Sequence, residues 1–532
     1  MNTTTLRFSF LALLFAAFAI PAGAQNMYDA FTLSQNNYGG TARSIALGNA
    51  MTAVGGDLGS LTLNPAGSAV AGYSQFTITP NISVSTITSQ GDEYGLSNKV
   101  RTDHTRFNLY NLGMTFDFNT GNDYGIRRYT FGIVANSSQN FLGDLYASGI
   151  NNRTSFMGCF AADSDGFAAA DLNRHSAYQD YSPAYWHSIM AYQSGMIATN
   201  NADADQYIAA SEKVFGDGSI GVAGDLDQRF GRTTLGNKTD LLLNFGMDIG
   251  DYLYLGANLG MVSVSYKCDS FIYESAVNDN DFALDFGADG IKYFNSARVR
   301  EFLDWDASGV YAKIGAILTP GAGLRIGAAI QTPTAMTVNE RYSMEGYTCY
   351  RNSRDNADSY SPTNEYSFGV KNPFRYNLGV AWTIGNVLLV SADYEACDYG
   401  SMRLRTVDEW DDANVFSDEN HDIPACFGIS RLFRAGLEVK PVPALALRVG
   451  YNLTTSPELD VNGSYIDADR TSVAVGLGYS SNGSFFADFA LRGAFWQDYT
   501  YPYRDYIDGV YSPELHNDRS LWDATCTIGW RF

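Results

Sequence analysis

The sequence lacks several features by which helical membrane proteins, enzymes and nucleic-acid-binding proteins are recognised. Beyond Ala24 no run of 18 apolar residues occurs, so no transmembrane helix is expected. The 6 cysteines show no CxxC or other close spacing, which indicates no metal site and assigns no pairs. No GxSxG or HExxH motif is present, and the 5 histidines fall in or beside expected loops, so neither enzymatic activity nor a haem or other cofactor is predicted. The net charge of −22 argues against nucleic acid as a partner.

The N-terminus carries the pattern of a secretory signal peptide. Arg7 precedes an apolar run from Phe8 to Ile20, and the small residues Ala22 and Ala24 follow in the usual cleavage pattern. The apolar run is too short to span a bilayer. We therefore expect residues 1–24 to be removed and the mature protein to be exported.

Aromatic residues and glycine are abundant, and many segments alternate with a period of two. The chain has 35 tyrosines and 52 glycines, which favours one large β structure over several domains. In LWDATCTIGWRF, alternate residues from Trp522 to Phe532 suit hydrocarbon, and those from Asp523 to Arg531 suit water. An aromatic residue that ends such a strand resembles the signal read by outer-membrane assembly machinery, which is therefore an expected partner.

The alternation predicts fourteen strands, an even number. They lie near residues 75–87, 105–118, 128–136, 239–249, 252–268, 309–318, 322–342, 375–384, 387–405, 428–439, 445–454, 471–479, 485–496 and 521–532.

Short and long connections between these strands alternate without exception. Short links such as Gly250–Asp251 are followed each time by a longer connection. A transmembrane β-barrel requires this parity, with short periplasmic turns and long outer loops, whereas a soluble sandwich has no reason to sort its loops by length. We therefore predict an all-β protein, a transmembrane antiparallel barrel of 14 strands in the outer membrane, with both termini in the periplasm. On this reading Tyr376–Ile384 and Phe433–Val439 present apolar faces to lipid.

The inward faces of the expected strands carry charges of both signs. These are Lys313, Arg325, Arg434, Arg448, Arg492 and Arg531, and Asp393, Glu395, Glu438, Asp488 and Asp523. They could line a polar conduit, or they could form ion pairs that fill a wide barrel. Because unpaired buried charges are costly and the two signs nearly balance, we favour ion pairs.

A small-residue segment, residues 25–74, precedes the first strand. It is too short for a separate plug domain, but it is long enough to fold inside the lumen of the barrel that residues 75–532 form. The apolar residues between Ile45 and Leu63 are too numerous for a flexible leader. Asp57 is placed to cap a helical turn that begins at Leu58, and Asn64–Pro65 then forces an extended or turned exit. We interpret the segment as a hatch that plugs the barrel.

The largest outer loop is expected at residues 137–238. It contains two helical-looking pieces, SPAYWHSIMAYQSGMIAT and ADADQYIAASEKVF. They could line an apolar ligand site, or they could pack as a cap over the mouth of the barrel.

The stretch GTARSIALGNAMTAVGGDLGSLTLNPAG resembles the N-terminal hatch of the FadL/TodX family of outer-membrane transporters for long-chain fatty acids and aromatic hydrocarbons. Its NPA triplet is Asn64, Pro65 and Ala66. Family-like strand pieces follow over nearly the whole mature chain: GDYLYLGANLG, LRIGAAIQTPT, SADYEACDYGSMRL and LRVGYNLTTSP. The resemblance implies a monomeric plugged barrel that takes apolar molecules from outside and releases them through a gap beside a kinked strand. Gly132 and the phase slip at Leu109–Tyr110 are the two places where we expect such a kink.

The sequence therefore favours a passive outer-membrane channel for hydrophobic small molecules, of the fatty-acid or hydrocarbon class. Asn64, Pro65 and Ala66 are expected to shape a hatch that rearranges when ligand binds. Arg43 and Asp57 are expected to tie the hatch to lumenal charges such as Arg325, Arg448 or Asp488. Alternatives are a binding or adhesion protein that acts through acidic outer loops, an outer-membrane lipase and a polar porin. The substrate itself, the lateral gap and the role of the long loop are left open.

Overall fold

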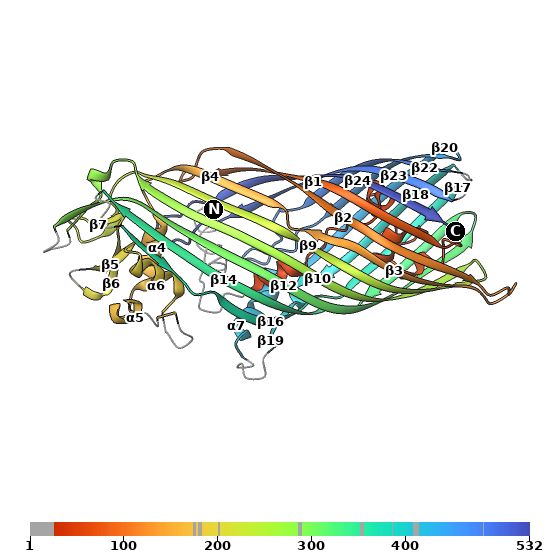
Figure 1. Ribbon diagram of the computed structural model, residues 1–532, viewed down its shortest axis with the longest axis horizontal. Coiled ribbons are helices and arrows are strands. Elements are labelled where there is room, and N and C mark those ends of the chain that lie inside the picture. The colour runs from red at the N-terminus through yellow and green to blue at the C-terminus, as the bar shows by residue number, and fades with distance from the viewer. Residues whose placement is uncertain are drawn as a thin grey trace.

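The period-two alternation becomes a closed antiparallel β-barrel in the computed structural model (Figure 1). The structure describes residues 26–173, 177–178, 184–200, 203–285, 290–351, 356–385, 387–407, 414–481 and 484–532. The expected signal peptide, residues 1–24, lies outside the described residues.

Fourteen crossings form the wall, as predicted. In chain order they are β1 (Gln75–Gly91), β2 (Val100–Asn119), β3 (Ile126–Asn140), β9 (Leu226–Ile249), β10 (Leu253–Ala276), β12 (Ile291–Gly321), β13 and β14 (Leu324–Gln331, Ala335–Tyr350), β16 and β17 (Asn364–Lys371, Arg375–Ile384), β18 and β19 (Leu388–Asp398, Arg403–Thr406), β20 (Ile429–Val442), β21 (Leu445–Thr454), β22 (Arg470–Ser480), β23 (Phe485–Thr500) and β24 (Leu515–Arg531). β1 pairs with both β2 and β24, which closes the barrel. Three crossings consist of two strands each, and Pro333, which has no backbone N–H, lies in the break between β13 and β14.

The outer surface of the wall is apolar where the sequence predicted contact with lipid. Leu378, Val380 and Trp382 project from β17 and are about half exposed, while Phe433 and Leu437 project from β20. The pairing of β1 with β24 joins the two strands that would be the edges of an open sheet, as a β structure in hydrocarbon requires.

The wall is taller on one side than on the other. β9 and β10 have 24 residues each and β12 has 31, whereas β21 has 10 and β22 has 11. Ten or eleven residues suffice to cross the hydrocarbon layer. The longer strands therefore continue beyond the membrane, towards the end of the barrel that carries the helices (Figure 1).

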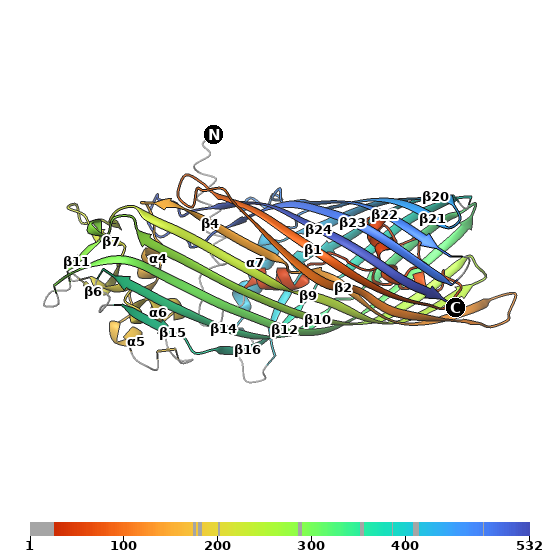
Figure 2. The same ribbon diagram turned by 45° about the horizontal axis from the view of Figure 1, so that its top comes forward.

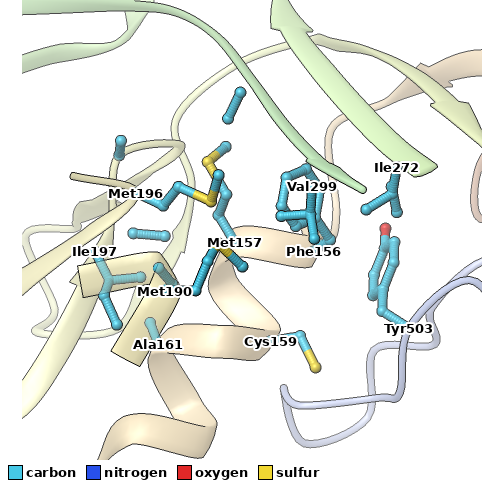
Figure 3. Packing of buried hydrophobic residues seen from close by; sticks show 14 of the residues in the cluster. Phe156, Met157, Cys159, Ala161, Met190, Met196, Ile197, Ile272, Val299 and Tyr503 are labelled. Carbon is cyan, nitrogen blue, oxygen red and sulfur yellow. The ribbon is translucent and has the colours of Figure 1, made fainter. Parts of the chain in front are cut away.

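A folded cap, residues 152–225, connects β4 (Gly143–Asn151) to β9. It contains α4 (Phe156–Ser164), α5 (Ala169–Asn173), α6 (Trp186–Gln193), β5 (Ile197–Asn200), β6 (Asp203–Ala209), β7 (Glu212–Val214) and β8 (Ile220–Val222). Met157, Met190 and Met196 pack together at its centre, and Phe156 reaches Val299 of the wall (Figure 3). Among the described residues, no helix is both long and apolar enough to cross a membrane.

The expected loop 137–238 was too wide, because the wall strands continue to Asn151 and resume at Leu226. The first helical-looking piece does form α6. The second was wrong, because it forms strands that include β6 and β7 rather than a helix. Of the two readings of this loop, the packed cap describes the observed cluster of buried residues.

Most of the inward charges form ion pairs, as the sequence favoured, whereas Lys313 and Arg325 bind backbone carbonyl oxygens. Arg434 pairs with Glu395 at 2.5 Å. A second group joins Arg448 to Glu438 at 2.6 Å and to Asp488 at 2.5 Å. These pairs offset charges that the wall directs into the lumen.

Candidate functional site

The segment before the first strand lies inside the barrel, and we call residues 26–74 the hatch. It contains α2 (Met27–Ser34), α3 (Ala42–Ala46), η2 (Leu58–Thr62) and η3 (Pro65–Ser68). Asn26 and Asp29 form a capping box at the start of α2, Thr41 caps α3 and Asp57 caps η2, each with its side-chain oxygen. α2 lies beside α7 (Ser417–Cys426), an outer-loop helix (Figure 2).

Glycines in the wall let the hatch backbone pack directly against the strands. A Cβ atom added at Gly256 of β10 would overlap the backbone of Pro65 and Ala66, and one added at Gly450 of β21 would overlap Gly48. The atoms that it would meet are backbone atoms, which cannot turn away as a flexible side chain can. The absence of a side chain at these positions therefore creates the space that the hatch occupies.

The NPA triplet lies at the innermost contact between hatch and wall. Asn64 is completely buried, and its amide donates to the backbone oxygens of Thr52 at 2.7 Å and of Ala316 in β12 at 3.1 Å. Its side-chain oxygen accepts from the backbone N–H of Ala66 at 3.1 Å. Asn64 thus joins two parts of the hatch to each other and to the wall.

Basic side chains of the wall bind carbonyl oxygens of the hatch. Lys313 Nζ donates to Thr62 O at 2.7 Å and Arg325 Nη1 to Val54 O at 2.7 Å. Lys238, Arg375 and Arg492 donate to backbone oxygens between Leu33 and Tyr38, and Asn244 and Asn258 donate to those of Pro65 and Leu61. The bonds from the lysine and arginine side chains are stronger than those from the neutral asparagines, because their donors carry a positive charge. Sequence reasoning missed Arg375, Asn244 and Asn258, whose inward positions in the alternation were the available signal, and Lys238, which lay in the expected loop.

The expected docking residues are arranged differently from the prediction. Arg43 pairs at 3.2 Å with Glu438, one of the expected inward charges, and Glu438 belongs to the group that contains Arg448 and Asp488. The expectation that Asp57 binds a lumenal charge was wrong: its carboxylate accepts from Thr41 Oγ1 at 2.6 Å and from the Gly59 N–H at 2.8 Å. Those short polar partners lie within the hatch, so Asp57 stabilises the hatch rather than its attachment.

A cavity of about 220 Å³ lies in the lumen between the hatch and the low side of the wall. Hatch residues 35–38 form one side of it, and side chains of β20 to β23 and of the loop 455–469 form the other. Phe31, Tyr399 and Trp496 give it aromatic surfaces. Burial and the nearby charge of Asp498 raise the pKa of the Glu458 carboxyl to about 7. The cavity therefore offers both apolar surface and hydrogen-bonding groups.

The wall is interrupted between β2 and β3. The two strands pair only from Asn111↔Asn136 to Asn119↔Arg128, although β2 continues to Val100. We call the space between residues 106–110 and residues 137–140 the β2–β3 window. A cavity of about 340 Å³ lies there, with Phe107 and Leu112 on its outer side and Asn108 on its inner side.

Hatch backbone covers the inner side of the β2–β3 window. The Gly39 N–H donates to Ser137 O at 2.9 Å and the Asn37 N–H donates to Ser138 O at 2.7 Å. Asn37 and Gln139 also line the lumenal cavity. The same short stretch of hatch therefore contacts both the cavity and the window.

The strand irregularities agree with one of the two expected kink positions. The phase slip at Leu109–Tyr110 is confirmed, because the β1–β2 pairing passes from Asn111 to Leu109 and leaves Tyr110 as an extra residue. The alternative was the third strand around Gly132, and Gly132 itself pairs regularly with Thr115 and Asn244. The bulge of β3 instead lies between Ser137 and Gln139, where Ser138 has no partner in β9.

A charged cluster joins the cap to the loop that precedes β24. Asp163 of α4 accepts from His187 Nε2 at 3.1 Å and from Arg504. Burial alone would raise the pKa of the Asp163 carboxyl, but hydrogen bonds and charges from His187 and Arg504 outweigh it and hold this pKa below its ordinary value. A carboxyl group whose pKa is lower in the folded protein than in the unfolded chain stabilises the fold at a pH above the unfolded-state pKa. This stabilisation is lost as the pH falls through the pKa of the folded state.

We therefore expect the cap to loosen in acid, below a pH of about 4, and Arg504→Gln to move that transition to higher pH. Limited proteolysis of residues 152–225 at stepped pH measures it. Arg153→Gln is the matched control, because Arg153 lies over the Tyr94 ring and not beside Asp163. Identical pH profiles for wild type and Arg504→Gln would show that the ion pair does not hold the cap.

Within the described ranges, no group of three or more His, Cys, Asp or Glu side chains is arranged to hold a metal ion. The site is therefore built from the hatch, the lumenal cavity and the β2–β3 window.

These features define a membrane β-barrel whose lumen is occupied by its own N-terminal segment. No protein-family model and no curated protein matches the sequence. Solved structures share the fold, among them the following two. A FadL homologue from Pseudomonas aeruginosa has 13% sequence identity to this chain and a TM-score of 0.52. The match covers 94% of this chain and 99% of the homologue. The toluene transporter TodX from Pseudomonas putida has 12% sequence identity and a TM-score of 0.50, and the match covers 93% of this chain and 99% of TodX. The chain therefore has the FadL/TodX fold that its N-terminal motif suggested.

Proposed function

We propose that this protein is an outer-membrane channel for the passive uptake of hydrophobic small molecules, of the fatty-acid or hydrocarbon class. The observation that carries the proposal is the hatch stretch of residues 35–39, which lines the lumenal cavity and covers the β2–β3 window. The solved structures of the same fold include a toluene transporter, which agrees with this proposal.

The proposed route runs from the outer side into the lumenal cavity and then sideways through the β2–β3 window. Ligand in the cavity displaces residues 35–39, which frees the Ser137 and Ser138 carbonyls and uncovers the window. The ligand then meets Phe107 and Leu112 and leaves into the membrane. An apolar chain gains about 0.8 kcal/mol for each CH₂ group that stays out of water, so a sideways exit avoids the cost of crossing the periplasm.

The deeper part of the hatch, with Asn64, Pro65 and Ala66, is proposed as the hinge on which this movement depends. The proposal includes a monomer that is not an enzyme, and assembly machinery that reads the C-terminal Phe532.

Asn64→Ala is expected to lower uptake of a hydrophobic probe while the barrel still assembles. The change removes the hydrogen bonds to Thr52, Ala316 and Ala66, and each buried group left without a partner costs about 1–3 kcal/mol. Radiolabelled oleate uptake by cells, normalised to surface level, measures the effect. Asn122→Ala, in an exposed periplasmic turn, is the control. Normal uptake by Asn64→Ala at normal surface level would remove Asn64 from the mechanism.

The proposed substrate class is tested on the protein itself. Mass spectrometry of protein extracted in mild detergent is expected to find fatty acids, hydrocarbons or similar lipids above the level in a control barrel. If none is bound and polar solutes cross vesicles that contain the protein, the protein is a porin instead.

A further inference from the structure

A second interruption of the wall lies between β22 and β23, and four strands, β23, β24, β1 and β2, separate it from the β2–β3 window. β23 pairs with β22 only as far as Phe495, which lies opposite Thr471. The next residues, from Trp496 to Thr500, pair with β24 alone. The backbone of the preceding loop bonds elsewhere: residues 455–459 bind near the start of β20, as in the bond from the Gly428 N–H to Pro457 O at 2.7 Å, and residues 460–468 bind within the loop. We call this place the β22–β23 seam.

Cavities lie on both sides of the β22–β23 seam. The lumenal cavity of about 220 Å³ lies inside, and a groove of about 1040 Å³ lies outside, over β23, β24, β1 and β2. Ala468, Trp496 and Gln497 line both of them. The wall here is therefore one layer of side chains, without a strand.

The side chain that fills the seam is loosely held. The Arg470 guanidinium stacks over the Trp496 ring at 4.2 Å. Its Nη2 atom is buried and has no hydrogen-bond partner among the described residues. A stacked pair with an unsatisfied donor can separate at lower cost than a strand pair, because no backbone hydrogen bond has to break.

The outer groove is amphipathic along its height. Its apolar part consists of Val84, Phe495 and Trp522. The rings of Phe495 and Trp522 meet edge to face, with their centroids 5.7 Å apart. Polar groups, including Thr86, Asp467, Asp469 and Asp518, form the rest. Two cations line the groove and both are paired, Arg101 with Asp103 at 3.2 Å and Arg519 with Asp498 at 2.6 Å. The remaining carboxylates of the groove therefore present hydrogen-bond acceptors.

β22 has 11 residues, which is about the length that crosses hydrocarbon, so its outer end and the seam lie at the outer membrane interface. Lipid-dissolved amphiphiles place their head groups at this depth. The apolar part of the groove suits the hydrocarbon chain of such a molecule. The carboxylates of the groove accept hydrogen bonds from its head group and repel a head group that carries a negative charge.

We propose that the β22–β23 seam is a side entrance through which uncharged, hydroxyl-bearing amphiphiles pass from the outer leaflet into the lumenal cavity. The Arg470–Trp496 pair is its gate, and Ala468 forms its narrowest rim. The two openings then have separate tasks, with loading at the β22–β23 seam and release at the β2–β3 window. This inference rests on the proposed function, because it uses the same cavity, but it adds an origin and a head-group chemistry for the ligand.

The test uses the full-length protein in vesicles of phosphatidylethanolamine and phosphatidylglycerol that are loaded beforehand with a diazirine-bearing hexadecanol. After illumination, mass spectrometry counts label on the lumenal peptide that contains residues 35–38 and on the groove peptide that contains Phe495. In the wild type both are expected to be labelled, and a diazirine-bearing palmitate is expected to label the groove less.

Ala468→Trp fills the rim, and we expect it to reduce lumenal label about tenfold, which corresponds to about 1.4 kcal/mol in the barrier, while groove label stays. Val461→Trp, in the same loop but away from both cavities, is the control. Trp496→Ala removes the gate and is expected to increase lumenal label, so the test does not depend on one variant.

Lumenal label that is unchanged in both Ala468→Trp and Trp496→Ala would overturn the side entrance and leave the proposed function in place. Equal groove labelling by palmitate and hexadecanol would overturn the head-group preference. Absence of lumenal label in the wild type would overturn both the entrance and the proposed conduit.

Discussion

Gly256→Leu is expected to displace the hatch and to turn the barrel into an open pore. Its Cβ atom would overlap the backbone of Pro65 and Ala66, and neither that backbone nor strand β10 can move aside. Overpacking of this kind costs about 1–3 kcal/mol, and the hydrogen bonds from Asn244 and Asn258 to the hatch are lost as well. The wall has its own strand pairing, so the barrel is expected to assemble. Conductance in planar bilayers should rise from near closed to that of a wide pore.

The matched control for this experiment is Gly216→Leu. Gly216 lies in the cap, and a Cβ atom added there would meet nothing within 4 Å. It is expected to conduct as little as the wild type. A closed Gly256→Leu barrel with normal surface level would show that the hatch does not depend on this contact.

Deletion of Ser138 is expected to close the β2–β3 window and to abolish uptake of a hydrophobic probe. Ser138 is the extra residue of the β3 bulge, so its removal allows Ser137 and Gln139 to pair consecutively with β9. It also removes the carbonyl that accepts from the Asn37 N–H. Without the bulge, β3 can continue its hydrogen-bonded pairing with β2 beyond Asn111, where the pairing now ends. Uptake of radiolabelled oleate should fall to the level of cells without the protein.

Ser138→Ala separates this effect from loss of the side chain. It keeps the bulge and removes only the hydroxyl, which donates to Asp240 Oδ1 at 2.9 Å. We expect Ser138→Ala to transport nearly as well as the wild type. Equal uptake by the deletion and the wild type would place the exit elsewhere.

The strands were predictable from the sequence where one face meets lipid and the other meets the lumen. Residues Tyr376 to Ile384 and the C-terminal strand alternate clearly for that reason. The signal fades where the tall strands pass beyond the membrane, because both faces there meet protein or water. That is why residues 137–151 and 226–238 were taken for loop although they form wall.

The attachment of the hatch was predictable only in part. The turn at Asn64–Pro65 and the cap at Asp57 follow from local sequence. The partners do not, since Lys313 and Arg325 bind backbone carbonyl oxygens, which every residue has and which leave no trace in the sequence. A pairing such as that of Arg43 with Glu438 joins residues far apart in the chain, so it depends on how the closed barrel brings them together.

The central claim is that the protein conducts hydrophobic molecules while its hatch excludes polar ones. Intact cells with and without the protein should be compared for uptake of radiolabelled oleate, toluene and a polar sugar, with equal surface amounts checked by immunoblot. The account predicts that the protein increases uptake of oleate or toluene and leaves that of the sugar unchanged. Faster sugar uptake without any gain for the hydrophobic probes would contradict it.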